Sequence, residues 1–300
     1  MDVLRTYPVK FRLSVNKGKY SDMSPVKQST PGRLLNVSIV LLFAVLASAC
    51  ATSPEGRKQL KLLPDDQINS MGIQSFEEIK KATPETEDQN KIAYVQCIAN
   101  AIIPQLDENN NPAQWEVRVF ADDQANAFAL PGNKIGVYEG LFKYAVNQHQ
   151  VATVMGHELA HVIAEHGNER VSDSLAAEAG IAIAAIALGT SSSMSNEQKA
   201  LIVGGLGLGV QYGVILPFSR THESEADLIG LDLMAKSGFN PEESVKLWQN
   251  MSKAGGQPPE FLSTHPSNET RIKDLQERMP RANAEYQKAQ AHNKRPNCHL

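Results

Sequence analysis

The sequence predicts a mainly helical α+β domain, on three observations. Most long segments carry apolar residues at the three- and four-residue spacing of an amphipathic helix, and only three short segments within 115–138 have the character of strands. With 300 residues and 42% hydrophobic content, the chain can bury a sizeable core. Three cysteines exclude a disulfide-dense small domain, a net charge of −4 excludes an extended disordered chain, and no basic excess indicates a nucleic-acid partner.

The first part of the chain has the pattern of an export signal. Residues 1–49 hold seven Lys/Arg and two Asp/Glu, a net of +5, whereas the remaining residues hold 22 and 31, a net of −9. The apolar run Leu34–Ala49 is too short for a spanning helix and ends at Ala47-Ser48-Ala49-Cys50, which resembles a bacterial lipobox. We therefore expect a signal peptide over 1–49, a lipid such as palmitate on Cys50, and a polar tether over 50–64.

Two further residues bear on the location of the protein. Met23 would begin a signal peptide of conventional length, with Lys27 and Arg33 as its basic region. Ala51 follows the cysteine, where an aspartate favours inner-membrane retention in Gram-negative lipoproteins. We expect an outer-membrane lipoprotein facing the periplasm of the cell envelope; the alternative is a plain N-terminal anchor with a buried cysteine.

The predicted elements follow in chain order. Asp65 or Asp66 can cap a first helix, and a second carries one apolar side. Trp115, Val117 and Val119 alternate with polar residues, and Pro131-Gly132-Asn133 separates two further strands. Gly238 can end one late helix, and Asn240-Pro241 can begin the next. The expected helices cover about 65–81, 87–103, 147–170, 219–237, 241–253 and 267–279; the expected strands cover 115–119, 127–130 and 134–138.

Two apolar stretches rich in small residues lie between these helices, at 175–188 and 200–216. The first contains Glu178 and is too short to span a bilayer, and the second has glycines at GxxxG spacing. A helical hairpin packed on the domain is the favoured interpretation, and a transmembrane pair is the alternative.

His157-Glu158-Leu159-Ala160-His161 predicts a metal site. Residues four apart share one face of a helix, so both imidazoles can reach one ion, with Glu158 beside it. Zinc accepts mixed nitrogen and oxygen ligands, and Glu158 can move a proton between a water and a leaving amine. Coincidence alone is the competing explanation for such a short motif.

A second helix can supply the third ligand. Glu223 and Asp227 are four residues apart and share a face, so Glu223 can complete a His₂Glu zinc site. Asp227 can hold the second nitrogen of a liganding imidazole. Glu225 is the rival ligand. The alternative interpretation of the whole segment 222–227 is an acidic helix face exposed to solvent. His166 is rotated away from the ligand face and is left out of the set.

Residues 119–271 resemble the zinc metallopeptidase family of HtpX, the CAAX prenyl endopeptidase and the lipoprotein LoiP. Together with the lipobox, the resemblance is strongest to the lipid-anchored branch of this family. The matching pieces are Asn126–Gly132, Gly156–His161, Ser219-Arg220 with Glu223–Asp227, and Thr264-His265-Pro266 with Arg271. The resemblance implies a minigluzincin-like core, with a short β-sheet, an active-site helix and a second ligand helix. It also implies that His265 stabilises the oxyanion and that a strand near 126–132 binds the substrate backbone.

These observations together predict a zinc metalloendopeptidase domain over 65–285, with a tail over 286–300 and one zinc ion per chain. The expected substrates are envelope proteins, which the enzyme would degrade in quality control, and the envelope assembly machinery is a possible partner. A different class remains open: an assembly factor or chaperone-like binding protein whose metal is structural or regulatory. An aminopeptidase with the same metal chemistry is a third alternative.

The two remaining cysteines, Cys97 and Cys298, predict a disulfide. The expected compartment is oxidising, Cys97 lies off the main apolar side of its helix, and Cys298 sits in a polar tail. Two unrelated thiols are the alternative.

Overall fold

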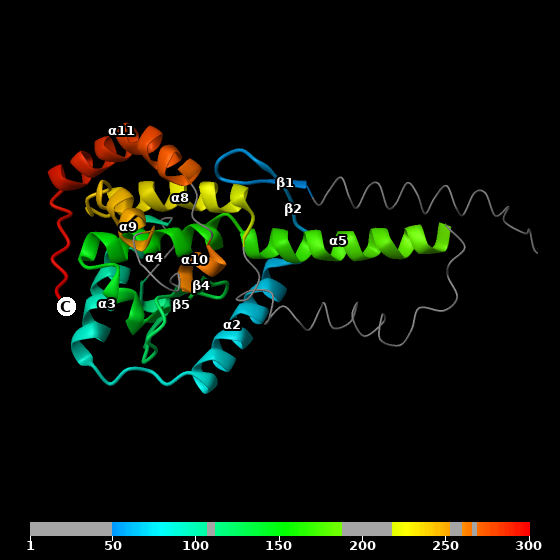
Figure 1. Cartoon of the computed structure of the whole chain (residues 1–300), viewed down its shortest axis with the longest axis horizontal. Helices are drawn as coiled ribbons and strands as arrows, with labels where there is room; N and C mark the ends of the chain where they lie inside the picture. The colour runs from blue at the N-terminus through cyan, green and yellow to red at the C-terminus, as the bar shows by residue number, and fades with distance from the viewer. Residues whose placement is uncertain (1–49, 107–111, 188–217, 253–259, 266–268) are drawn as a thin grey trace, which may run out of the picture. The chain divides into compact units, whose positions relative to one another are not determined.

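The computed structural model describes residues 50–106, 112–187, 218–252, 260–265 and 269–300 (Figure 1). This part of the chain is mainly helical and contains small sheets, so the predicted fold class is confirmed. The predicted signal peptide and the apolar stretch at 200–216 lie outside the described residues. Within the described ranges, no helix is both long enough and apolar enough to cross a membrane.

Most helices lie close to their predicted positions, and several begin at a side-chain cap. Asp88, Asn147 and Ser219 each accept a backbone N–H from the first turn of the helix that follows. The described helices are α2 (Asp65–Ala82), α3 (Gln89–Ile102), α4 (Gln148–Ile163), α5 (His166–Ala187), α8 (Arg220–Lys236), α9 (Glu243–Ser252), α10 (Glu260–Thr264) and α11 (Glu269–Ala291), with short 3₁₀ turns η1 (Ile103–Gln105), η2 (Pro112–Gln114) and η3 (Glu139–Lys143).

A three-stranded sheet lies against α4. Its strands are β3 (Glu116–Phe120), β4 (Ala127–Leu130) and β5 (Lys134–Tyr138), in the order β3-β5-β4. The central strand β5 is parallel to β3 and antiparallel to β4. Gly132 and Asn133 have φ values of 82° and 63°, the left-handed conformation that the turn between β4 and β5 requires. Among the described strands β4 is an edge, and it faces the helix that carries the histidine motif.

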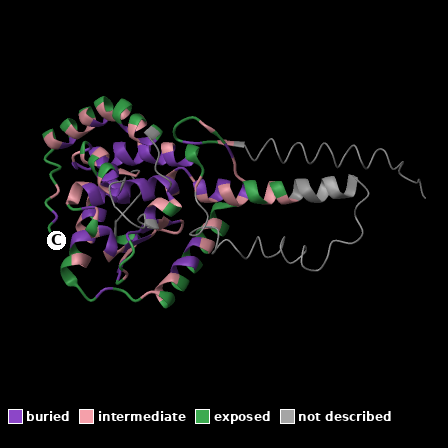
Figure 2. Cartoon of the chain, in the orientation of Figure 1, coloured by how far each residue is buried: buried purple, intermediate pink, exposed green. Residues whose placement is uncertain are grey.

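Helices α4 and α8 pack directly against each other, and most residues of each helix are buried (Figures 1 and 2). Glycines let their backbones approach closely. A Cβ added to Gly230 would lie 2.7 Å from the backbone nitrogen of His157, and one added to Gly156 would lie 2.8 Å from the carbonyl oxygen of Gly230. This contact sets the spacing between the two helices expected to supply ligands.

Two helices differ in length from the prediction. The helix expected over 147–170 is interrupted, because Glu165 has a φ of 52°, and α5 starts afresh at His166. Helix α11 continues past exposed Pro280 to Ala291, because Ala282 and Ala289 bury the same side of the helix beyond the proline.

The segment expected to be a tether is folded. β1 (Cys50–Thr52) and β2 (Lys58–Leu60) pair antiparallel, with Gly56 at a φ of 87° in their turn. We call residues 50–60 the N-terminal hairpin. Gln59 in it is buried and donates to Glu169 and to the carbonyl oxygen of Ala164. Polar composition suggested a solvated linker, but here the polar groups find buried partners.

The C-terminal tail is also held in place. Cys298 is 5% exposed and forms a disulfide with Cys97 of α3, with a Cα–Cα distance of 5.7 Å. The backbone N–H of Cys298 donates to the side chain of Gln148 at 2.9 Å. The bond links two positions 201 residues apart, so the tail packs against the N-terminal half of the domain.

Candidate metal centre

Helix α4 presents two imidazoles side by side. His157 and His161 are 2% and 4% exposed, and their Nε2 atoms lie 3.1 Å apart. Asn147 caps the start of this helix, and the close approach of Gly230 sets its position against α8. The four-residue spacing therefore brings both nitrogens to one point, as the sequence predicted from helical geometry.

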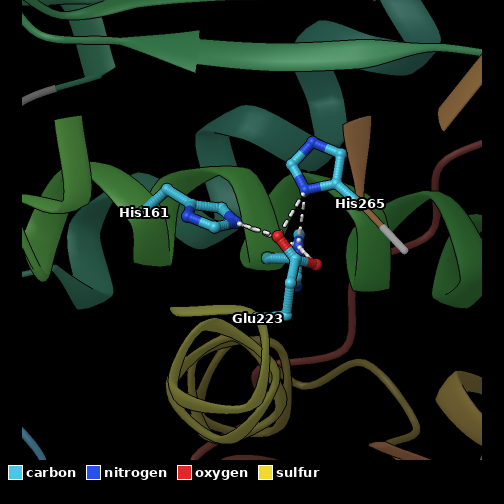
Figure 3. Close-up of side chains that lie close together, drawn as sticks. His161, Glu223 and His265 are labelled. Carbon is cyan, nitrogen blue, oxygen red and sulfur yellow. Dashed lines mark hydrogen bonds and ion pairs between the residues drawn. The ribbon is translucent and has the colours of Figure 1, made fainter. Parts of the chain in front are cut away.

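Helix α8 brings a carboxylate to the same point from its first turn. Oε2 of Glu223 lies 3.4 Å from Nε2 of His157, and Oε1 lies 3.5 Å from Nε2 of His161. Glu223 is 1% exposed. Figure 3 shows His161 and His265 reaching the carboxylate of Glu223 from two sides.

The donor atoms suit a single ion of the zinc type. A tetrahedral ion about 2.0–2.1 Å from each ligand holds the ligand atoms roughly 3.4 Å apart, close to the separations found here. Two imidazole nitrogens and a carboxylate oxygen are the donor set of a catalytic zinc site. His157, His161, Glu223 and His265 are all buried, and each offers one ligand atom within 4.8 Å of the others.

The electrostatics of the cluster favour a cation. Burial lowers the pKa of His157, but hydrogen bonds with Asp227 and Glu223 outweigh burial and raise the pKa to about 9. Burial raises the pKa of Glu223, yet hydrogen bonds from His157, His161 and His265 bring it well below its usual range. Burial lowers the pKa of His161. The carboxylates of Glu223 and Asp227 thus make this point favourable for positive charge.

His265 lies at the cluster, just past the end of α10. Its Nδ1 is 3.0 Å from Oε1 of Glu223 and 3.2 Å from Nε2 of His157, while its Nε2 is 3.4 Å from Oε1 of Glu158. The sequence interpretation gave it the oxyanion role by resemblance. The structure places its ring between the candidate ligands and the candidate base, with Nδ1 among the donor atoms.

Glu158 is buried beside the cluster rather than within it. It is 3% exposed, and its Oε1 accepts no hydrogen bond from the described residues. Burial raises the pKa of this carboxyl, an effect that His265 and His157 partly oppose. A buried carboxyl with an oxygen that accepts no hydrogen bond and with a raised pKa is suited to exchanging a proton.

A carboxylate and an arginine support His157 from behind. Nδ1 of His157 lies 3.0 Å from Oδ1 of Asp227. Arg271, on α11, donates to both oxygens of Asp227, at 2.6 and 2.8 Å, and its Nη1 lies 2.7 Å from Oε2 of Glu223. Its guanidinium also lies 4.0 Å from the ring centre of Trp248. Asp227 was predicted for this position, whereas Arg271 had been matched without a role.

Comparison with known proteins identifies the family. A family model for Peptidase family M48 matches residues 89–279, which is more than half of the chain and includes every member of the cluster. The chain belongs to this family. M48 peptidases use zinc, so the predicted cofactor is confirmed, and the buried cluster of histidines and Glu223 is able to bind such an ion.

Named relatives of this M48 chain come from mitochondria and bacteria. It is 37% identical over 172 residues to mitochondrial metalloendopeptidase OMA1 of Schizosaccharomyces pombe, a match covering 56% of this chain and 48% of the relative. It is 25% identical over 236 residues to the β-barrel assembly-enhancing protease of Escherichia coli K12, covering 77% of this chain and 48% of the relative. The chain spans about half the length of these curated relatives.

Two cavities of the M48 domain lie beside the metal centre. A cavity of about 30 Å³ is lined by Glu158, His161 and His265 together with β4. A larger cavity, of about 450 Å³, is lined by the end of β4, His161, Arg170 and Phe218. Phe218 stacks on His161, with ring centres 3.9 Å apart, so it forms a wall common to both cavities.

The sequence interpretation missed the residues behind His161. His166 was excluded as a ligand, and it lies on the far side of the ring, with its Nδ1 2.9 Å from Nδ1 of His161. Glu225, the rival ligand, contacts His166 and Arg57 instead. The position of His166, five residues after His161, could have suggested a contact only if the break at Glu165 had been foreseen. No sequence signal links Arg57 to the site.

Proposed function

We propose that the protein is a zinc-dependent endopeptidase of the bacterial cell envelope. The observation that carries this proposal is the arrangement of His157, His161 and Glu223 around one point, with the buried carboxyl of Glu158 beside it at a cavity. His157, His161 and Glu223 act as the three protein ligands. A structural metal would not require such a carboxyl, so Glu158 argues against a pure binding protein.

The residues of the chain divide the chemistry between them. Bound zinc supplies Lewis-acid activation of a water and of the scissile carbonyl. Glu158 takes a proton from the attacking water and passes it to the leaving amine. His265 donates a hydrogen bond to the oxygen that gains negative charge. Asp227 and Arg271 keep His157 in the tautomer that presents Nε2 to the metal.

Substrate binding is assigned to β4. Ala127–Leu130 form an edge among the described strands, and residues of this strand line the cavity that contains Glu158 and His265. An extended peptide added to this edge would place a backbone carbonyl near the metal centre. Binding through the backbone suits an endopeptidase with unfolded or unassembled protein substrates.

The test of the reaction is zinc content together with cleavage of casein. Glu158→Gln should retain zinc and lose roughly 10²–10⁴-fold in cleavage rate, the usual contribution of general acid–base catalysis. His161→Ala should lose both zinc and cleavage. The matched control is Glu87→Gln, at an exposed glutamate, which should change neither. Full cleavage by Glu158→Gln would reject the mechanism, and cleavage only of substrates with free N-termini would indicate an aminopeptidase.

The proposed location and domain plan rest on the N-terminal sequence. We assign 1–49 to a signal peptide, 50–64 to the segment after a lipidated Cys50, 65–285 to the peptidase domain and 286–300 to its tail, in an outer-membrane lipoprotein of the LoiP-like branch. The Cys97–Cys298 disulfide suits an oxidising compartment. Cys50→Ala should abolish palmitate labelling and leave a larger precursor, with Cys97→Ala as the control; unchanged labelling would reject the anchor.

Proteins of the envelope are the proposed substrates. Two relatives, from Escherichia coli and Yersinia pestis, carry the name β-barrel assembly-enhancing protease, which supports work near the envelope assembly machinery. The identification of proteins that accumulate in cells expressing Glu158→Gln tests this assignment. Accumulation of envelope proteins is expected, and an unchanged envelope proteome would contradict it.

A further inference from the structure

The second ring nitrogen of His161 is held through another histidine. Nδ1 of His161 lies 2.9 Å from Nδ1 of His166, the first residue of α5, and His166 is fully buried. Nε2 of His166 lies 3.1 Å from Oε2 of Glu225 on α8. Four groups thus form one line: the metal position, His161, His166 and Glu225.

Only one arrangement of hydrogens satisfies this line when Nε2 of His161 binds a metal. The ligand nitrogen must offer its lone pair, so the hydrogen of His161 is on Nδ1 and is donated to Nδ1 of His166. His166 then carries its hydrogen on Nε2 and donates it to the carboxylate of Glu225. A carboxylate behind a liganding imidazole fixes the tautomer and the ring orientation, and here an extra imidazole lies between them.

The N-terminal hairpin supplies the cation that holds this carboxylate. Nε of Arg57 donates to Oε2 of Glu225 at 3.0 Å, and its two terminal nitrogens donate to the two oxygens of Glu169. Glu225 and Glu169 have side chains only 4% and 8% exposed, so each needs a positive partner. The planar fork of arginine can bind both carboxylates at once.

Arg57 is itself fixed by the fold of the hairpin. Its backbone N–H donates to Oγ of Ser53 at 3.1 Å, across the turn that contains Gly56. The next residue but one, Gln59, donates to the carbonyl oxygen of Ala164 and to Glu169, at the break between α4 and α5. The hairpin therefore contacts the chain on both sides of the break that places His166 behind His161.

We propose that Arg57 is a positioning residue of the metal centre, which acts on the ligand His161 through Glu225 and His166. This inference rests on the proposed role of His161 as a zinc ligand. It makes the segment next to Cys50 a part of the metal site, although it lies about a hundred residues before His161 in the sequence.

The test measures zinc affinity and the visible spectrum of the Co²⁺-substituted protein, in a Glu158→Gln background that prevents self-cleavage. Arg57→Ala should weaken zinc binding about 10- to 100-fold, the usual effect of losing such outer support, and should alter the Co²⁺ absorption bands. The matched control is Lys58→Ala. Lys58 is the exposed next residue, bonded to Thr52 in the same hairpin, and zinc affinity should stay within about twofold.

A conservative variant separates positioning from folding. Glu225→Gln keeps the side-chain shape but is a weaker acceptor for His166, so it should also weaken zinc binding and shift the Co²⁺ bands. If Arg57→Ala does not fold, the result for Glu225→Gln tests the inference. Folded Arg57→Ala or Glu225→Gln with wild-type affinity and spectrum would overturn the inference. A parent protein that binds no zinc at all would instead reject the proposed function.

Discussion

The two histidines of the metal centre are supported from behind in different ways. His157 contacts a carboxylate directly, and Asp227 is held by Arg271 from α11, both nearly inaccessible to solvent. His161 reaches its carboxylate through His166, and Glu225 is held by Arg57 from the N-terminal hairpin. The side chain of Arg57 is 25% exposed, whereas that of Arg271 is 1% exposed.

Because the two arginines differ in burial, their loss should differ in its cost to the stability of the fold. The Asp227–Arg271 pair lies in the core, where an ion that loses its partner is costly. In the Glu225–Arg57 pair only the carboxylate is buried; Arg57 lies between β1 and β2 with a quarter of its side chain exposed, so solvent reaches this pair more readily. We therefore expect loss of Arg271 to affect folding and metal binding together, and loss of Arg57 to affect mainly metal binding.

The largest expected effect is that of Arg271→Ala. The change leaves the carboxylates of Asp227 and Glu223 buried without their arginine, so the free energy of unfolding of the metal-free protein should fall by about 3–5 kcal/mol. Urea unfolding followed by circular dichroism measures this loss. The matched control is Arg278→Ala on the same helix; its partner Asp232 keeps a second arginine, Arg281, at 3.1 Å, so the loss should be only about 1 kcal/mol.

The burial of these pairs predicts how strongly each arginine variant lowers the free energy of unfolding, and the measurement can contradict this order. If Arg57→Ala lowers the free energy of unfolding as much as Arg271→Ala does, the two supports do not differ in the way that their burial indicates. If Arg271→Ala costs no more than Arg278→Ala, burial of the Asp227–Arg271 pair has no energetic consequence.

The same two supports show what could be predicted from the sequence. Helical periodicity and four-residue spacing sufficed for α4, α8 and the meeting of His157, His161 and Glu223, because these relations are local or depend on one helix pairing. Asp227 was predicted for the same reason. The parallel pairing of β3 with β5 was not, since it joins segments through an intervening strand.

The second support could not be predicted because it depends on two features that have no signal in the sequence. One is the left-handed conformation of Glu165, which breaks the expected helix and turns His166 towards His161. The other is the folding of a polar segment into the N-terminal hairpin, which places Arg57 beside Glu169 and Glu225. Neither a polar composition nor a charge pattern identifies buried partners more than a hundred residues away.

The ion pairs of Glu116, on β3, can be compared with the two arginine–carboxylate pairs behind the metal site. Oxygens of Glu116 lie 3.0 Å from Nζ of Lys80 and 2.9 Å from Nζ of Lys134, and the Glu116 side chain is 21% exposed. Burial raises the pKa of Glu116, but hydrogen bonds from Lys134 and Lys80 outweigh it and lower the pKa to about 2. Because solvent screens this cluster, its contribution to stability should be about 1 kcal/mol, below that of Asp227 and Arg271.

The sign of its pH dependence follows from the lowered pKa. Glu116 has a lower pKa in the folded protein than its ordinary value of 4.5, so its contribution is fully present above that value and is lost as the pH falls towards about 2. Glu116→Gln should therefore lower the free energy of unfolding by about 1 kcal/mol at pH 7, and its difference from the wild type should shrink steadily below about pH 5. Urea titrations of both proteins across this range measure the difference. If the difference in free energy of unfolding stays constant with pH, the ion pairs of Glu116 contribute nothing. If Glu116→Gln lowers the free energy of unfolding at pH 7 as much as Arg271→Ala does, exposed and buried pairs do not differ.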